Sequence, residues 1–473
     1  MSKTQPARGM RDFLPADVRR REYVMGVVRE VYERYGFEPL ETPAVENIET
    51  LTGKYGEEGN QLIFKILKRG EHERTGAADL ALRYDLTVPL ARVVAEYGER
   101  LPKFFKRYQM QPVWRADRPA RGRFREFYQC DVDAIGSRSM IVEAEICAAA
   151  SDALTALGFT NFTIRLNHRR VLAGVLDAAG VAPELHGDAL IVLDKLDKIG
   201  TEGVARELNE RGVSGDAGVK LLHFFEGVAK LEHAAELVSD EVLDTEGGAT
   251  RADALNAAML GRLVEFLGEH EAGAQGADEL RQILQFAGAA GVGARIKLDP
   301  SLARGLSYYT GAIMEISVPD LAGSLGGGGR YDNLVGMFSG RDIPACGFSL
   351  GLERIIVVMT EREMFPSNLV TTAADVLVTI WDESSVVDAL ALARRLRAGG
   401  LRVDVYPERG DKVGKQFKYA AARGVPFVTV AGPDERARGE VALKDMRSGE
   451  QQTVESGAAA ETLRKLLEAN GNG

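Results

Sequence analysis

The sequence has few of the residues from which disulfide frameworks and structural metal sites are built. Its three cysteines, Cys130, Cys147 and Cys346, lie far apart and form no CxxC pair. Its six histidines show no ligand spacing such as HxxxH. These absences exclude a disulfide scaffold, and we expect neither a structural zinc nor another metal site made only of protein side chains.

Long apolar segments are also missing. No run approaches the roughly 20 residues that a membrane-spanning helix needs. The first residues, MSKTQPARGMRDFLP, are polar and charged and lack the apolar core of a signal peptide. We therefore expect a cytoplasmic protein with no membrane contact. With 473 residues, of which 45% are apolar and 27% charged, the chain has a globular composition and room for two or three domains.

The chain lacks the positive charge that is usual in nucleic-acid-binding proteins. Lysine and arginine together number 59, against 69 acidic residues, for a net charge of −10. The charge is uneven, however. Residues 375–473 hold 15 basic and 15 acidic residues, whereas residues 100–125 hold nine basic residues and a single acid, Asp117. Phosphate binding depends on local potential, so RNA contact could be confined to a few segments.

The order of helical and strand-like patterns divides the chain into three parts. Residues 1–170 and 291–366 mix both patterns, and we predict that they form one α+β catalytic domain on a mainly antiparallel sheet. Residues 171–290 are rich in Ala, Leu, Glu and Asp at helical spacing and predict a helical insertion with a largely solvated surface. Residues 374–473 alternate strand and helix, which predicts a small C-terminal α/β domain.

A basic loop joins two predicted strands, residues 105–115 and 125–136. Guanidinium groups pair with phosphates and aromatic faces stack on bases, so such a loop suits a nucleoside triphosphate or an RNA end. A solvated arginine-rich hairpin has the same composition. Strand alternation turns Gln129 and Asp133 toward a sheet face, where polar groups need partners. The basic side chains are Arg115, Arg118, Arg121, Arg123 and Arg125, followed by Phe127 and Tyr128.

Two other segments combine glycine with polar or aromatic residues. Four glycines at 326–329 indicate close approach of a ligand or of another backbone, although a flexible loop is an alternative. In ARGLSYYTG (303–311), a predicted strand places Tyr308 and Tyr309 on opposite faces, and a buried Arg304 would need an anionic partner.

Charged residues also lie at two predicted helix starts. Arg354 lies in the first turn of the predicted helix 351–363, where the helix dipole disfavours a cation unless an anion offsets it. Asp85 and Thr87 precede the predicted helix 88–97, and either could simply cap it.

The order of these motifs resembles the class II aminoacyl-tRNA synthetases and, within them, the histidyl-tRNA synthetases. GFEPLETPAVE resembles motif 1, FKRYQMQPVWRADRPARGRFREFYQCDVDAIG motif 2, and GFSLGLERI motif 3. ARGLSYYTG, GGGGRYDNLV and RGMRDFLP resemble signatures of the histidine enzymes, and the C-terminal α/β domain resembles the class IIa anticodon-binding module. The resemblance implies a homodimer that uses ATP with Mg²⁺, L-histidine and tRNA(His).

The resemblance also implies roles for individual residues. The catalytic residues would be Arg115, Arg304 and Arg354. Those implied in ATP binding are Arg115, Arg125, Phe127 and Arg354. Those implied in histidine binding are Asp85, Leu86, Thr87, Arg115, Gln129, Asp133, Arg304, Tyr308 and Tyr309.

Two departures from the family pattern and two alternatives accompany this interpretation. Ser307 stands where many members have aspartate, and Ala120 stands where some bacterial members have a polar residue facing the extra 5′ nucleotide of the tRNA.

One alternative is the non-catalytic paralogue that regulates ATP phosphoribosyltransferase and typically lacks the anticodon domain. The other is a class II synthetase for glycine, proline or threonine. The three arginines, ARGLSYYTG and the C-terminal domain favour the histidine enzyme.

Overall fold

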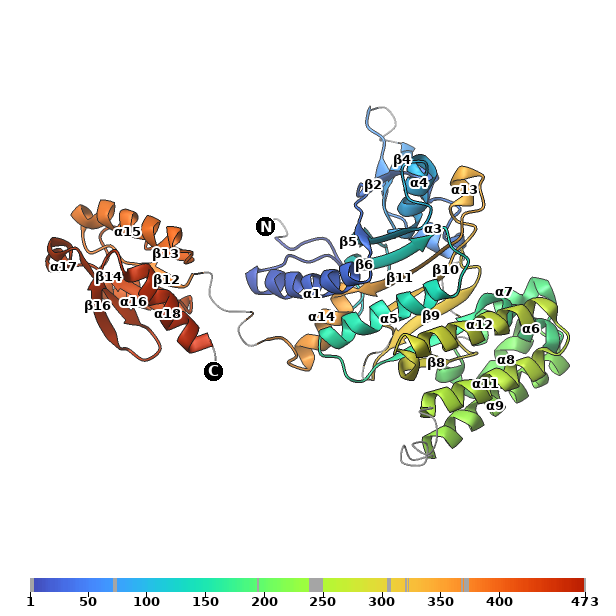
Figure 1. The fold of residues 1–473 in the computed structure, drawn as a ribbon. Coiled ribbons are helices and arrows are strands. Elements are labelled where there is room, and N and C mark those ends of the chain that lie inside the picture. Colours follow the sequence, from blue (N-terminus) through green and yellow to red (C-terminus); the bar gives the residue numbers. More distant parts are fainter. Residues whose placement is uncertain are drawn as a thin grey trace. The chain divides into compact units, whose positions relative to one another are not determined.

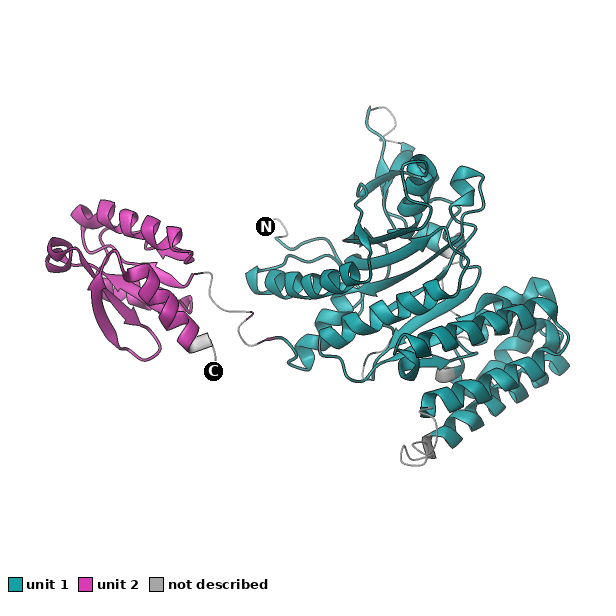
Figure 2. Ribbon diagram, in the orientation of Figure 1, with its two compact units in different colours: residues 1–365 teal, residues 366–473 magenta. Residues whose placement is uncertain are grey.

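The computed structural model describes residues 4–70, 75–193, 195–237, 250–303, 308–319, 321, 323–366, 369 and 374–471. The chain forms two compact units, residues 1–365 and residues 366–473 (Figure 2). In the described part of the chain, no helix is both long and apolar enough to cross a membrane.

An eight-stranded sheet is the centre of the first unit (Figure 1). The pairs β1–β5 and β7–β8 are parallel and the other pairs are antiparallel, which confirms the prediction of a mainly antiparallel sheet. The strands, in spatial order, are β1 (Glu38–Pro39), β5 (Phe105–Trp114), β6 (Glu126–Ile135), β11 (Ala345–Gly351), β10 (Gly326–Arg330), β9 (Ala312–Ser317), β7 (Thr163–His168) and β8 (Ile296–Leu298).

Three helices pack on the apolar face of this sheet: α1 (Pro15–Arg34), α5 (Ile141–Ala156) and α14 (Leu352–Glu361). Helix α1 ends before Gly36, which adopts a positive φ of 76°, as expected for a glycine that follows a helix. Val132 of β6 and Phe348 of β11 are paired neighbours in the buried core beneath these helices. Because strand side chains alternate, the residues between them face the opposite side, which is free for a binding site.

A second, smaller sheet lies beside the first. It has the order β2 (Val45–Asn47), β4 (Ala78–Leu82) and β3 (Lys65–Leu67). Its neighbours in the chain are the helices α2 (Ile48–Leu51), α3 (Gly56–Gln61) and α4 (Thr87–Tyr97), and α13 (Gly336–Ser339) contacts α4.

The segment between β7 and β8 is helical. Among its described residues, the longest elements form one continuous core with the helices on the main sheet. They are α6 (Arg169–Ala179), α7 (His186–Leu193), α8 (Leu196–Glu210), α9 (Gly215–Leu237), α11 (Arg251–Leu267) and α12 (Glu271–Ala289), and the 3₁₀ turns Pro183–Leu185 and Gly293–Arg295 flank them.

The second unit has a five-stranded sheet of its own, in which three parallel strands are extended by an antiparallel pair. Both faces are covered, because alternate residues of β12 and β14 belong to two separate cores. The strands are β13 (Val403–Val405), β12 (Val376–Val378), β14 (Phe427–Val430), β15 (Glu440–Asp445) and β16 (Gln451–Glu455). The helices are the 3₁₀ turn Glu383–Ser385, α15 (Val386–Ala398), α16 (Val413–Ala422), α17 (Pro433–Arg438) and α18 (Ala459–Gly471).

One predicted strand is wrong. Residues 303–311 do not form a strand in their described part: β8 ends at Leu298 and β9 begins at Ala312. Tyr308 and Tyr309 therefore precede the strand, and their positions do not follow from strand alternation. The chain leaves the sheet here, which lets the Tyr308 hydroxyl reach Asp85.

Candidate active site

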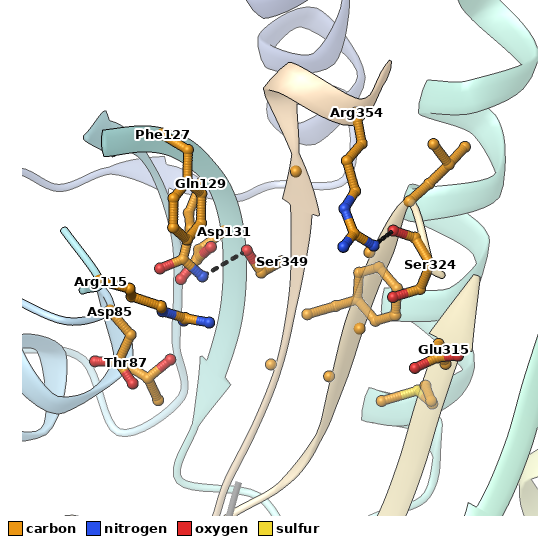
Figure 3. Close-up of a pocket in the computed structure, with 18 of the residues that line it drawn as sticks. Asp85, Thr87, Arg115, Phe127, Gln129, Asp131, Glu315, Ser324, Ser349 and Arg354 are labelled. Atoms are coloured by element: carbon orange, nitrogen blue, oxygen red, sulfur yellow. Dashed lines mark hydrogen bonds between the residues drawn. The ribbon is translucent and has the colours of Figure 1, made fainter. Parts of the chain in front are cut away.

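A cavity of about 410 Å³ lies on the polar face of the large sheet. Strands β6, β10 and β11 form its floor, and loops before α4 and around motif 2 contribute to its walls. The structure brings nine of the predicted site residues to its lining, some of which are labelled in Figure 3. The nine are Asp85, Thr87, Arg115, Phe127, Gln129, Asp133, Tyr308, Tyr309 and Arg354.

The glycine run forms strand β10, not a flexible loop. A Cβ atom at Gly328 would lie 2.2 Å from the carbonyl oxygen of Gly347, so this position admits no side chain without separating the strands. Gly327 has more space, and its register pairs it with Ser349 and therefore with the polar face. The prediction of close approach is confirmed, and a bare backbone at 327 leaves room above the cavity floor.

Asp85 is at the amino-terminal end of helix α4 and is almost fully buried. Its Oδ1 accepts hydrogen bonds from the Tyr55 hydroxyl and the Val88 N–H, both at 3.0 Å, and its Oδ2 accepts one from the Tyr308 hydroxyl at 3.0 Å. The capping interpretation is thus confirmed, yet the same carboxylate lines the cavity. Burial raises the pKa of Asp85, and the Val88 N–H, the nearby Arg115 and the two tyrosines oppose that rise.

Beneath this end of the cavity, two carboxylates share one fully buried guanidinium. Arg107 Nη2 lies 2.8 Å from Asp133 Oδ2 and 3.9 Å from Asp131 Oδ2. The Tyr331 hydroxyl donates to Asp133 Oδ1. Burial raises the pKa of Asp133, while Arg107 and Tyr331 counteract the effect. Arg107 and Asp131 were not predicted as site residues. Polar residues alternate at 107, 109 and 111 along β5 and at 129, 131 and 133 along β6, which indicates one polar face on each strand.

Arginines and an aromatic ring also line the cavity, with Arg115 beside Asp85 and Arg354 on the other side (Figure 3). Arg115 Nε donates to the Tyr84 carbonyl at 3.0 Å, and its guanidinium lies 4.3 Å from the Tyr84 ring and 5.2 Å from the Phe127 ring. Arg354 Nη1 donates to the Ser324 carbonyl at 2.5 Å. The guanidinium groups and the Phe127 ring thus suit an anionic ligand with a flat, stackable group.

A buried glutamate connects the motif 2 strand to helices α1 and α14. Glu353 accepts hydrogen bonds from Arg21 Nη1 at 2.8 Å and from the Tyr128 N–H at 2.9 Å. Since Tyr128 lies between Phe127 and Gln129, these bonds fix the strand position that presents both side chains to the cavity. These hydrogen bonds of Glu353 were not predicted from the sequence.

Three predicted site residues are not in the described cavity lining. Leu86 is buried, and its carbonyl accepts a hydrogen bond from Arg107 Nη2 at 3.2 Å. Arg125 Nε donates to the Asp117 carbonyl at 3.0 Å, so its guanidinium supports the loop. Arg304, like Ser307, lies outside the described residues.

The chemistry of the cavity follows from two kinds of lining group. Its carboxylates, amide and tyrosine hydroxyls suit a cationic amino acid. Its guanidinium groups and the Phe127 ring suit a nucleoside phosphate. Within the described ranges, no group of three or more His, Cys, Asp or Glu side chains is arranged to hold a metal ion.

Comparisons with known proteins agree along the whole chain. Residues 9–355 match the family described as histidyl-tRNA synthetase, and residues 375–466 match the anticodon binding domain. The histidine–tRNA ligase of Cytophaga hutchinsonii is 40% identical over 99% of this chain and 100% of its own length. That of Gloeobacter violaceus is 41% identical over 97% of this chain and 98% of its own length. The crystal structure of histidyl-tRNA synthetase from Nostoc superposes with a TM-score of 0.77 at 31% identity, covering 98% of this chain and 100% of that one.

The same comparisons decide between the alternatives. A structure from Bacillus halodurans described as an ATP phosphoribosyltransferase regulatory subunit/histidyl-tRNA synthetase shares the fold, at 22% identity and a TM-score of 0.68. The full-length ligases are far more similar and include the anticodon-binding domain, which argues against the regulatory paralogue and against a synthetase for another amino acid. The chain therefore belongs to the histidyl-tRNA synthetase family of class II aminoacyl-tRNA ligases.

Proposed function

We propose that this cavity activates L-histidine with ATP and that the protein then transfers the histidyl group to the 3′ end of tRNA(His). The observation that carries the proposal is one continuous cavity whose lining combines carboxylates and tyrosines with arginines and the Phe127 ring. Such a cavity can hold an amino acid and a nucleotide end to end, with their reacting atoms between the two sets of side chains.

At the amino-acid end, we assign the α-amino group to Asp85, Thr87 and Gln129. Asp133 and the two tyrosines, Tyr308 and Tyr309, face the imidazole ring. Support comes from the tyrosine hydroxyl at 3.0 Å from Asp85 and from the polar row of β6. A polar pocket selects histidine because an analogue without ring N–H groups leaves buried partners unpaired.

At the nucleotide end, we assign the α-phosphate to Arg115, the γ-phosphate to Arg354 and the adenine face to Phe127. The geometry supports this because Arg115, Phe127 and Arg354 line the same cavity and the Arg115 guanidinium lies 5.2 Å from the Phe127 ring. Mg²⁺ would arrive bound to the ATP phosphates and neutralise part of their charge. In this scheme Arg125 contributes to ATP binding indirectly: it supports the motif 2 loop through its hydrogen bond to the Asp117 carbonyl.

The reaction needs no protein nucleophile. The histidine carboxylate attacks the α-phosphorus, pyrophosphate leaves, and a ribose hydroxyl of the terminal adenosine later takes the histidyl group. The protein contributes position and electrostatic stabilisation of the charge that develops on phosphate oxygens. We further propose that Arg304 acts on the α-phosphate, as the family resemblance implies. Arg304→Ala should then abolish adenylate formation while the fold persists, and near-normal activity would refute the role.

The remaining parts of the chain complete the proposal. Residues 1–170 and 291–366 would form the catalytic domain, residues 171–290 the insertion, and residues 374–473 the module that binds the anticodon. We propose a cytoplasmic homodimer that contacts its copy through the motif 1 region. The exposed apolar side chains of Val45 and Leu80 on the small sheet support this, because a second copy would cover them. Light scattering on the purified protein tests the dimer.

The direct test is ATP–pyrophosphate exchange by the purified protein. We expect exchange that depends on L-histidine, followed by charging of tRNA(His). Glycine, proline and threonine serve as control amino acids and should not support exchange. Exchange with one of those in place of histidine, or none at all, would contradict the proposal.

A further inference from the structure

Three buried acceptor atoms of cavity-lining residues have no hydrogen-bond partner among the described residues: Gln129 Oε1, Asp131 Oδ1 and Asp133 Oδ2. Asp133 Oδ2 forms an ion pair with Arg107 Nη2 at 2.8 Å, which leaves Gln129 Oε1 and Asp131 Oδ1. Both side chains belong to β6, two residues apart, and therefore face the same side (Figure 3). The orientation of the Gln129 amide is set by Ser349, because Gln129 Nε2 donates to Ser349 Oγ at 2.8 Å. Buried acceptors without donors are costly, so this pair indicates that a donor arrives with a ligand.

The charge balance at this end points to a cationic donor. Three carboxylates, Asp85, Asp131 and Asp133, are each at most 2% exposed. The guanidinium groups described here are Arg107, which is fully buried, and Arg115. Hydrogen bonds occupy both oxygens of Asp85, whereas Asp133 has a hydrogen bond from Tyr331 at Oδ1 and a 2.8 Å ion pair with Arg107 at Oδ2. Asp131 Oδ1 has no hydrogen bond, and the ion pair of Arg107 with Asp131 is longer, 3.9 Å to Oδ2.

An ammonium group fits these two acceptors better than a ring N–H. It carries three donors and can bond to Gln129 Oε1 and Asp131 Oδ1 at once, whereas a ring nitrogen offers a single donor. A charged donor also compensates a buried carboxylate, which a neutral one does not.

We propose that Asp131 is a specificity-determining residue that binds the α-ammonium group of histidine together with Gln129. The proposal rests on the histidine-binding role proposed above and adds a residue to it. Asp131 thus selects a substrate with a free amino group.

The surroundings of Asp131 support this assignment. It is faced by Arg107 and Gln109 from β5, by Gln129 and Asp133 from its own strand, by Ser349 from β11 and, farther away, by Asp85. Burial raises the pKa of Asp131 to about 7, Arg107 opposes the rise, and the negative charge of Asp133 adds to it. An arriving ammonium would shift the balance toward the ionised carboxylate.

Asp131→Asn tests the proposal, because it keeps the size of the side chain and removes the charge. In histidine-dependent pyrophosphate exchange, we expect the KM for histidine to rise on the order of 10–100-fold. The kcat and the KM for ATP should change little. Asp299→Asn is the matched control: Asp299 is also buried and pairs with Arg165, but it does not line this cavity.

A second probe separates the amino group from the ring. Imidazolepropionic acid keeps the ring and the carboxylate but lacks the α-amino group. Its inhibition constant should be the same for the unaltered protein and for Asp131→Asn. An unchanged KM for histidine, or equal weakening of histidine and the inhibitor, would overturn the proposal. Absence of exchange by the unaltered protein would instead contradict the proposed function itself.

Discussion

At the scale of single residues, Arg115 is the side chain on which both ends of the cavity depend. Its guanidinium lies between the Tyr84 and Phe127 rings and is held by the Tyr84 carbonyl. Arg115→Lys keeps the charge but loses the planar fork and the stacking. We expect a fall in kcat for pyrophosphate exchange of about 100-fold or more, with little change in melting temperature. Arg121→Lys is the control, because Arg121 is exposed and pairs with Glu361; a similar loss there would contradict the role.

Without a bound ligand, the buried carboxylates of the same cavity lower the free energy of unfolding at neutral pH. A carboxyl whose pKa is raised by folding stabilises the fold at low pH and loses that contribution as pH rises through the folded-state pKa, which for Asp131 is about 7. Asp131→Asn should therefore melt higher than the unaltered protein, by roughly 2–4 °C if the gain is about 1 kcal/mol. The difference should grow between pH 5 and pH 7.5 and level off above. Scanning calorimetry without ligand measures it, and a variant that melts lower at pH 8 would contradict the argument.

At the scale of elements, β10 shows two separate reasons for glycine in one strand. A Cβ atom at Gly328 meets the Gly347 backbone at 2.2 Å, whereas at Gly327 its nearest contact is the Met314 carbonyl at 3.4 Å. Gly328→Ala should destabilise the fold by about 1–3 kcal/mol. Gly327→Ala should leave stability unchanged within about 0.5 kcal/mol and raise the KM for ligands, since its methyl group faces the cavity. Chemical denaturation and exchange kinetics on both variants check this; equal destabilisation would contradict the distinction.

The elements themselves could largely be predicted from the sequence. Strands β5 and β6 and helices α4 and α14 begin and end within about two residues of their predicted bounds. The break before Tyr308 could not be predicted, since its cause is a contact with Asp85, 223 residues away in the chain. Arg107 was missed for the same reason: its partners lie on a neighbouring strand that only the sheet topology identifies. Side-chain alternation in the sequence predicts which face of a strand a residue occupies, whereas strand pairing determines which residues contact that face.

At the scale of the whole molecule, the cavity and the region that matches the anticodon binding domain belong to different compact units. The complete cavity lining lies in residues 1–365, and the match to the anticodon binding domain lies in residues 375–466. A chain shortened by residues 375–473 should therefore retain pyrophosphate exchange within a few-fold, because it keeps the cavity and its own core. Charging of tRNA(His) should fall by about 100-fold or more, mostly through the KM for tRNA, since anticodon contacts contribute only to tRNA binding. Circular dichroism shows whether the shortened chain is folded. An equal loss of both activities by a folded chain would mean that the second unit supports the cavity as well as the tRNA.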